Sequence, residues 1–288
     1  MRALFAAILA LGALLLARPS AARPRIVAAE NMYADVARQI AGPAVDVRAI
    51  MSNPDTDPHL FEATPRVARA LAHARIVVEN GAGYDPWMAR LIAANPAPGR
   101  VAIVIAALIG ARTGANPHLW YAPATMPAFA RALTAALIAQ DPAHRDGYRR
   151  RDAVFLASLR PIAARIAALR ARYAGTKVTA TEPVFGYLAR ALGLDMRNHG
   201  FQRAVMNGTE PSPRDVAAME RDLDRHAVRV LIYNRQASDP AAQRLLHRAR
   251  SAGVPVLGVT ETEPAGTTYQ SWVMGELDAL AALLARTP

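Results

Sequence analysis

The sequence contains no cysteine, and Lys177 is its only lysine. The absence of cysteine excludes disulfides, thiolate metal ligands, cysteine nucleophiles and lipid attachment through an N-terminal cysteine. Beyond residue 22, no run is long and apolar enough to span a bilayer. The mature chain is therefore expected to be soluble and free of a membrane anchor.

The first 22 residues have the three parts of a secretory signal peptide. Arg2 supplies a short positive start, residues 4–16 form an apolar core, and Ser20-Ala21-Ala22 is a cleavage site of small residues. We therefore expect residues 1–22 to direct export and the mature protein to be periplasmic.

The formal net charge of +11 is almost entirely due to arginine. Nucleic-acid-binding proteins are often basic, but they concentrate that charge in one face or stretch. Here the arginines are spread along the chain, without a dense basic run interleaved with aromatic residues. We therefore expect no nucleic-acid partner.

Short apolar runs alternate with helical patterns on both sides of a long central segment. The expected strands are 25–29, 45–50, 76–79, 101–106, 177–180, 228–232 and 254–259. This alternation predicts mostly parallel sheets covered by helices. The expected fold is α/β, with an N-terminal lobe (23–140), a linking helix (141–175) and a C-terminal lobe (176–288).

The central segment predicts one long helix. Its apolar residues recur at alternating spacings of four and three, which aligns them on one helical face: Phe155, Leu159, Ile162, Ile166, Leu169 and Tyr173. Asp141-Pro142 is a typical helix start, with the aspartate as N-cap, and Gly175 is a typical stop. Pro161 lies inside the helix and should bend it.

Polar side chains follow most predicted strands, at the edge where open α/β sheets bind ligands. They are Glu30, Asn31, His59, Asn80, Tyr84, His118, Glu182, Asn234 and Glu261. His59 and His118 each lie in a Pro-His-Leu-aromatic segment, where proline stiffens the loop that carries the imidazole. Two imidazoles and two carboxylates would balance a divalent cation, so a metal site between the lobes is one interpretation. Surface histidines and helix-capping glutamates are the other.

The remaining histidines divide into two groups. Four fall within predicted helices and are expected to be solvated: His73, His144, His226 and His247. His199 follows a predicted helix of the C-terminal lobe and could reach the cleft, so its role stays open. The sequence lacks a glycine-rich phosphate loop, a Gly-x-Ser-x-Gly elbow and a His-Glu-x-x-His pair, which argues against the enzymes that use them.

Several motifs together resemble the metal-specific (zinc/manganese) substrate-binding proteins of ABC transporters. They are Ala28-Ala29-Glu30-Asn31, Asp57-Pro58-His59 with Glu62, Asn116-Pro117-His118-Leu119-Trp120, Thr181-Glu182-Pro183, Glu210-Pro211-Ser212-Pro213 and Val259-Thr260-Glu261-Thr262. The resemblance covers essentially the whole mature chain. It implies two lobes bridged by a long helix, one transported divalent cation in the interlobe cleft, and delivery to an ABC permease and its ATPase.

Carried over by position, the resemblance implies four metal ligands: His59, His118, Glu182 and Glu261. Glu263, two positions further on, is a rival for the last. Glutamate at the third position resembles manganese- or iron-preferring members, and segment 108–115 lacks the histidine- and acid-rich loop of many zinc-specific members. Zinc nevertheless outcompetes manganese at most such sites, so the metal stays open.

We therefore expect a monomeric periplasmic metal receptor rather than an enzyme. One alternative is a secreted metal-dependent enzyme, which would need an open coordination position for water and a nearby general base. Another is a receptor of the same long-helix architecture for a chelate such as a siderophore or cobalamin. Its cleft would be wide and lined by aromatic residues or arginine.

Overall fold

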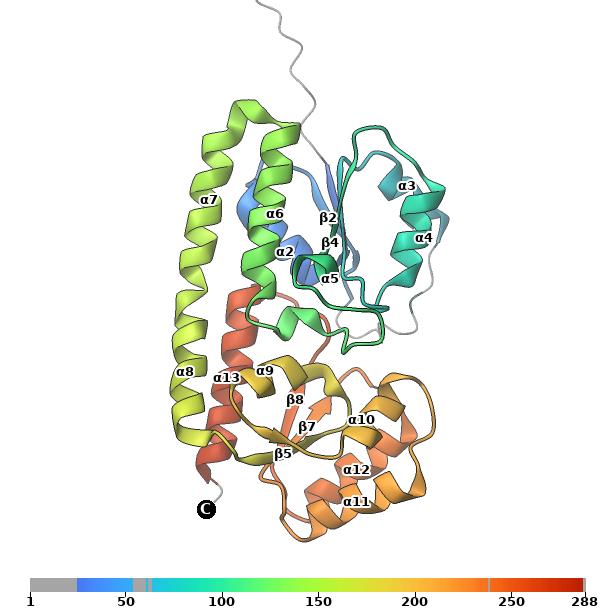
Figure 1. Ribbon diagram of the computed structural model, residues 1–288, viewed down its shortest axis with the longest axis vertical. Helices are drawn as coiled ribbons and strands as arrows, with labels where there is room; N and C mark the ends of the chain where they lie inside the picture. Colours follow the sequence, from blue (N-terminus) through green and yellow to red (C-terminus); the bar gives the residue numbers. More distant parts are fainter. Residues whose placement is uncertain (1–24, 54–60, 62–63, 238, 287–288) are drawn as a thin grey trace, which may run out of the picture.

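Two lobes lie one above the other and are joined along one side by long helices (Figure 1). The computed structural model describes residues 25–53, 61, 64–237 and 239–286. The expected signal peptide and His59 lie outside the described residues. Each lobe contains a parallel four-stranded sheet, and a long helical segment links the two, as the sequence predicts.

The N-terminal lobe, called lobe one, has the strand order β2-β1-β3-β4. All five residues of β1 are buried, which explains why this strand is a continuous apolar run rather than an alternating one. The elements of lobe one are β1 (Ile26–Glu30), α2 (Asn31–Ala41), β2 (Val47–Met51), α3 (Pro65–Ala72), β3 (Ile76–Glu79), α4 (Pro86–Ala94), β4 (Val101–Val104), α5 (Ile105–Leu108), η2 (Leu119–Tyr121) and α6 (Thr125–Gln140).

The C-terminal lobe, called lobe two, repeats this design with the order β6-β5-β7-β8. Two of its helices have side-chain N-caps, because Ser212 accepts the Asp215 N–H at the start of α11 and Asp239 accepts the Ala242 N–H at the start of α12. The elements are β5 (Lys177–Ala180), η4 (Pro183–Phe185), α9 (Gly186–Ala191), β6 (Asp195–Met196), α10 (His199–Met206), α11 (Pro213–Asp224), β7 (Leu231–Asn234), α12 (Pro240–Ser251) and β8 (Val256–Val259), followed by α13 (Tyr269–Arg286).

In both sheets the first strand of the lobe lies between the second and the third. This order opens a crevice at the carboxyl ends of the first and third strands, where α/β proteins bind ligands. The two crevices face each other across the seam between the lobes. Tyr84 and His118, which follow strands of lobe one, both contact Glu261, which follows β8 of lobe two.

The linking segment is divided, whereas the sequence predicts one helix. It consists of η3 (Pro142–His144), α7 (Arg145–Ser158) and α8 (Arg160–Tyr173), with the interruption at Leu159. Pro161 explains the interruption, because it has no N–H to complete the helical ladder. Asp141 precedes the first turn, but its side chain makes no cap bond to a backbone N–H. Gly175, in the left-handed region at φ +79°, follows the end of α8 as predicted.

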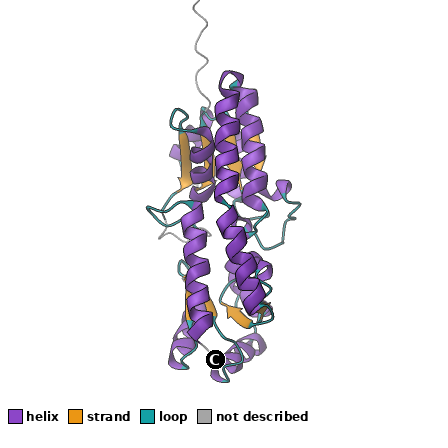
Figure 2. Cartoon of the chain, turned by 90° about the vertical axis from the view of Figure 1, so that its left-hand side faces the viewer, coloured by secondary structure: helices purple, strands orange, loops and turns teal. Residues whose placement is uncertain are grey.

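A second helix crosses the seam beside the linking segment. α13 packs against α8, and Figure 2 shows these helices side by side. Arg165 of α8 and Asp278 of α13 form an ion pair at 2.8 Å. The first turn of α13 is bonded to lobe one, because Tyr269 donates its N–H to Asp35 Oδ2 and its hydroxyl to the Trp120 carbonyl. Among the helices of the described residues, none combines the length and apolarity needed to cross a membrane.

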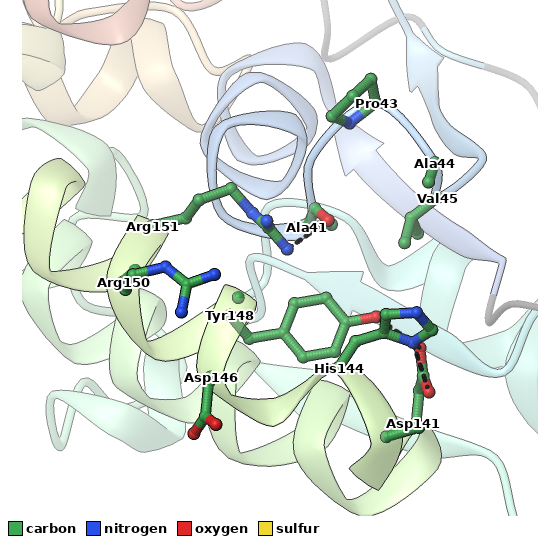
Figure 3. Close-up of a pocket in the computed structure, with 12 residues that line it drawn as sticks. Ala41, Pro43, Ala44, Val45, Asp141, His144, Asp146, Tyr148, Arg150 and Arg151 are labelled. Atoms are coloured by element: carbon green, nitrogen blue, oxygen red, sulfur yellow. Dashed lines mark hydrogen bonds and ion pairs between the residues drawn. The ribbon is translucent and has the colours of Figure 1, made fainter.

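A hollow of about 460 Å³ lies where α2 ends and α7 begins (Figure 3). Arg151 donates to the carbonyl oxygens of Ile40 and Ala41 at 2.7 and 2.9 Å. The Asp141 carboxylate accepts the Tyr148 hydroxyl at 2.8 Å and lies 2.7 Å from His144 Nδ1. These contacts occupy the carboxylate that would otherwise cap the helix. The hollow borders the amino end of β2, the edge opposite the crevice.

Candidate metal centre

The local structure around His118 fixes its imidazole at the seam. His118 lies between α5 and η2 and is fully buried. Asn116 Oδ1 accepts the backbone N–H of His118 at 3.1 Å, and Pro117 restricts the backbone between them. Asn80, just after β3, donates its amide to the Pro117 carbonyl at 2.9 Å. The loop is thus bound to the sheet of lobe one next to the residue that carries the imidazole.

Two carboxylates stand side by side in the crevice of lobe two. Glu182 follows β5, Glu261 follows β8, and their exposed fractions are 6% and 0%. Asn234 ends β7, the strand between them, and its amide donates to Glu182 Oε2 and to Glu261 Oε1, each at 2.7 Å. Gln236 donates its backbone N–H to Asn234 Oδ1, which fixes the orientation of the amide. One asparagine therefore holds both carboxylates.

The imidazole and one carboxylate meet across the seam. His118 Nε2 lies 3.3 Å from Glu261 Oε2, and both side chains are fully buried. Two ligands of one tetrahedral ion, with bonds near 2.1 Å, stand about 3.4 Å apart. The observed separation therefore suits a nitrogen and an oxygen that share a metal ion.

Tyr84 contacts the same carboxylate from lobe one. Its hydroxyl donates to Glu261 Oε2 at 3.0 Å. Burial, followed by the negative charges of Glu261 and Glu30, raises the pKa of the Tyr84 hydroxyl well above its ordinary value. The hydroxyl therefore keeps its proton and acts as a hydrogen-bond donor to Glu261.

The electrostatics of the centre favour a cation. Two ionised carboxylates that share one amide would repel each other at a buried site, where the effective dielectric constant is low. A divalent ion between them and an imidazole would remove that repulsion. The donor set of imidazole and carboxylate suits first-row transition metals.

Contacts link three of the four predicted ligands in a chain: His118 lies next to Glu261, and Glu261 shares the Asn234 amide with Glu182. The fourth, His59, lies outside the described residues. Within the part of the chain that is described, no three His, Asp or Glu side chains form a group that could hold a metal by themselves. The complete ligand set therefore stays a prediction.

The rival residue Glu263 has different contacts. Its backbone N–H and carbonyl are both bonded to the Asn31 side chain, at 3.0 and 2.7 Å. Burial, followed by the charge of Asp35 and opposed by Arg38, raises the pKa of the Glu263 carboxyl to about 8. The bonds to Asn234 and Tyr84 belong instead to Glu261, which is the better candidate.

The other histidines that the structure describes lie at the surface. His199 is the first residue of α10 and is exposed, unlike the buried His118. The four histidines expected to be solvated are also exposed: His73, His144, His226 and His247.

The roles of three polar residues are not predicted from the sequence. Asn234 and Tyr84 follow predicted strands, but nothing in their positions assigns them to the carboxylates. Asn116 appears only as part of a motif. The available signal for Asn116 was its place two residues before a candidate ligand, where a side-chain oxygen commonly accepts a backbone N–H.

Comparison with known proteins identifies the family. The family described as zinc-uptake complex component A, periplasmic, matches residues 26–283. The chain belongs to this family. Its members are periplasmic components of metal uptake, so the membership confirms the class of transport protein that the sequence resembles and assigns no enzymatic role.

Individual relatives agree with this assignment. A putative metal-binding protein of Treponema pallidum is 24% identical over 268 residues, covering 85% of this chain and 82% of that protein. The structure of the periplasmic zinc-binding protein TroA from Treponema pallidum matches with a TM-score of 0.76 at 21% identity, covering 92% of this chain and 100% of that one. The SBP FpvC of Pseudomonas aeruginosa, in complex with Mn²⁺, gives 0.74 at 21% identity, with 91% and 98% covered. These two structures confirm the fold.

Proposed function

We propose that the protein captures one divalent transition metal ion in the periplasm and delivers it to an ABC permease and its ATPase. The proposed ligands are His118, Glu182 and Glu261, with His59 as the fourth. The observation that carries the proposal is the 3.3 Å separation of His118 Nε2 and Glu261 Oε2 across the seam. The adjacent Glu182 carboxylate, held by the same amide as Glu261, supports it.

The burial of the centre favours an ion over a chelate. His118 and Glu261 have exposed fractions of 0% and lie close together, which leaves room for an ion but not for a siderophore or cobalamin between them. Membership in a family of uptake components favours transport over the metalloenzyme alternative. We further propose that the mature protein is a monomer without a membrane anchor.

The proposed cargo is zinc or manganese. Carboxylate oxygens suit the harder Mn²⁺, whereas imidazole suits Zn²⁺ and the general order of affinities favours Zn²⁺. Elemental analysis of the protein purified from its native periplasm would identify the ion, because a recombinant host loads whichever metal is abundant.

Metal titration of the mature protein tests the proposal. We expect binding of about one Zn²⁺ or Mn²⁺ per chain in calorimetry. His118→Ala and Glu261→Ala should each weaken binding by at least about 100-fold, since even partners outside the ligand set are worth 10- to 100-fold. His247→Ala, which removes an exposed histidine of α12, is the matched control and should bind like wild type.

Two outcomes would contradict the proposal. If His118→Ala and Glu261→Ala bound the ion with wild-type affinity, neither residue would be a metal ligand. Wild-type affinity in His59→Ala would remove His59 from the ligand set while leaving the other three in place.

A further inference from the structure

Asn116 contacts both lobes at the metal centre. In lobe one, its Oδ1 lies 2.6 Å from His118 Nδ1 and accepts the His118 backbone N–H at 3.1 Å. In lobe two, its Nδ2 donates to the carbonyl of Pro183 at 2.6 Å. Pro183 directly follows Glu182, so one side-chain amide bridges the loops that carry two proposed ligands.

The partners of Asn116 determine the tautomer of His118. A backbone N–H can only donate and a carbonyl can only accept, so Oδ1 must face His118 and Nδ2 must face Pro183. His118 Nδ1 therefore carries a hydrogen and donates it to Asn116 Oδ1. In a neutral imidazole this leaves the lone pair on Nε2, the atom that lies near Glu261.

The approach of lobe two to Asn116 is close. A Cβ added to Gly186 would lie 3.0 Å from Asn116 Nδ2. Gly186 has helical backbone angles, so its lack of a side chain is needed for space rather than for conformation. Tyr187, the next residue, donates its hydroxyl to the Asn116 backbone carbonyl at 2.8 Å.

We propose that Asn116 is a positioning residue that couples His118 to the Glu182 loop and so controls how fast the bound ion leaves. The inference rests on the proposed function. If lobe two moved away, the amide would lose its bond to the Pro183 carbonyl, and the contact of its oxygen with His118 would be less well fixed. Conversely, an ion on His118 fixes the imidazole, which holds Asn116 in the orientation that binds Pro183. Such coupling acts equally in both directions.

An amide is required for this role. Aspartate could still accept the hydrogen of His118 Nδ1, but it could not donate to the Pro183 carbonyl. Asn116→Asp therefore keeps the contact within lobe one and removes the contact to lobe two. Gly186→Ala displaces the amide without changing its chemistry. Tyr187→Phe removes only the bond to the backbone of the same loop.

The test measures affinity and dissociation separately. Zn²⁺ affinity is determined by chelator competition, and its dissociation rate by stopped flow with excess EDTA, for wild type and each variant. Asn116→Ala should weaken affinity by about 10- to 100-fold, as for other residues that orient a ligand histidine. Asn116→Asp and Gly186→Ala should release Zn²⁺ up to about tenfold faster, in line with the loss of one hydrogen bond. Tyr187→Phe should have a smaller effect in the same direction.

Thermal unfolding separates this role from a merely structural one. Without metal, the variants should unfold near the wild-type temperature. The rise in unfolding temperature that Zn²⁺ produces should be smaller in Asn116→Asp and Gly186→Ala than in wild type. Wild-type dissociation rates in both would overturn the coupling, and wild-type affinity in Asn116→Ala would overturn the positioning role too. If wild type bound neither Zn²⁺ nor Mn²⁺, or His118→Ala bound them with wild-type affinity, the proposed function itself would be wrong.

Discussion

The two lobes share a strand order, yet their crevices have different contents. Each has a glutamate at or just past the end of its first strand and an asparagine at or just past the end of its third. These are Glu30 and Asn80 in lobe one, and Glu182 and Asn234 in lobe two. In lobe two the amide donates to carboxylates, and in lobe one the corresponding amide donates to carbonyls.

The crevice of lobe one is closed by its own hydrogen bonds. Tyr33 donates its hydroxyl to Asn80 Oδ1 at 2.6 Å, and the Asp85 carboxylate accepts the backbone N–H groups of Asn80 and Gly81. Glu30 is fully buried beside them. Its burial, and then the nearby Asp85 carboxylate, raise the pKa of the Glu30 carboxyl well above its ordinary value. The polar groups of lobe one therefore support the His118 loop, whereas those of lobe two hold the carboxylates of two candidate ligands.

The largest expected difference in Zn²⁺ affinity is between the alanine variants of Asn234 and Asn80. Asn234→Ala should weaken Zn²⁺ binding by about 10- to 100-fold, because it removes the donor that holds both carboxylates. Asn80→Ala should instead lower the free energy of unfolding by about 1–3 kcal/mol, because it leaves buried partners unsatisfied. Chelator competition and urea unfolding measure the two effects. Equal losses of affinity would show that the lobes do not divide these roles.

Glu30 should make the free energy of unfolding depend on pH. An unfolded glutamate loses its proton near pH 4.5, whereas folded Glu30 keeps it to higher pH. Glu30 therefore lowers stability progressively as pH rises from about 4.5 through its raised pKa. Glu30→Gln should remove this loss and be more stable than wild type at alkaline pH, without a large change in Zn²⁺ affinity.

Glu182→Gln is the matched variant of lobe two and should chiefly weaken Zn²⁺ binding. Urea unfolding of metal-free wild type and Glu30→Gln between pH 4 and 9 measures the effect on stability. Zn²⁺ titration of both variants measures the effect on binding. If Glu30→Gln kept the wild-type pH dependence, Glu30 would be ionised in the folded protein.

The smallest effect is expected for Tyr84→Phe. This change removes one hydrogen bond to Glu261 Oε2 while keeping the ring. The loss of roughly 0.5–1.5 kcal/mol corresponds to an affinity about two- to tenfold lower. Leu71→Ala, a buried residue of α3, is a useful contrast, because it should reduce stability more than affinity. If Tyr84→Phe lost as much Zn²⁺ affinity as Glu261→Ala, Tyr84 would take part in binding directly.

The sequence predicts the fold class and the edge at which the candidate ligands lie, because both depend on local rules. Alternating strands and helices imply parallel sheets, and residues after such strands meet at one edge. The two hydrogen-bond partners of Asn234 cannot be predicted from local rules, because Glu182 lies 52 positions before it and Glu261 lies 27 after it. Its role depends on which strands are neighbours in the sheet.

The start and interruption of the linking helix illustrate a different limit. Asp141 has the sequence of an N-cap, but Tyr148 and His144 compete for its carboxylate once the turn has formed. Pro161 predicts a bend, and the ladder is interrupted two residues earlier, at Leu159. Both outcomes are set by contacts within the segment itself, namely the side chains that bind Asp141 and the N–H that Pro161 lacks, and the spacing of the apolar residues does not show them.

The pairing of α8 with α13 constrains how an empty molecule can differ from a loaded one. Two helices packed side by side bend least within the plane that contains both helix axes. The lobes can therefore move most easily by rocking out of that plane. The outline of the molecule then changes little. In the proposed function, a permease would therefore have to distinguish the metal-free from the metal-bound protein by the surface of the loops around the seam rather than by the span between the lobes.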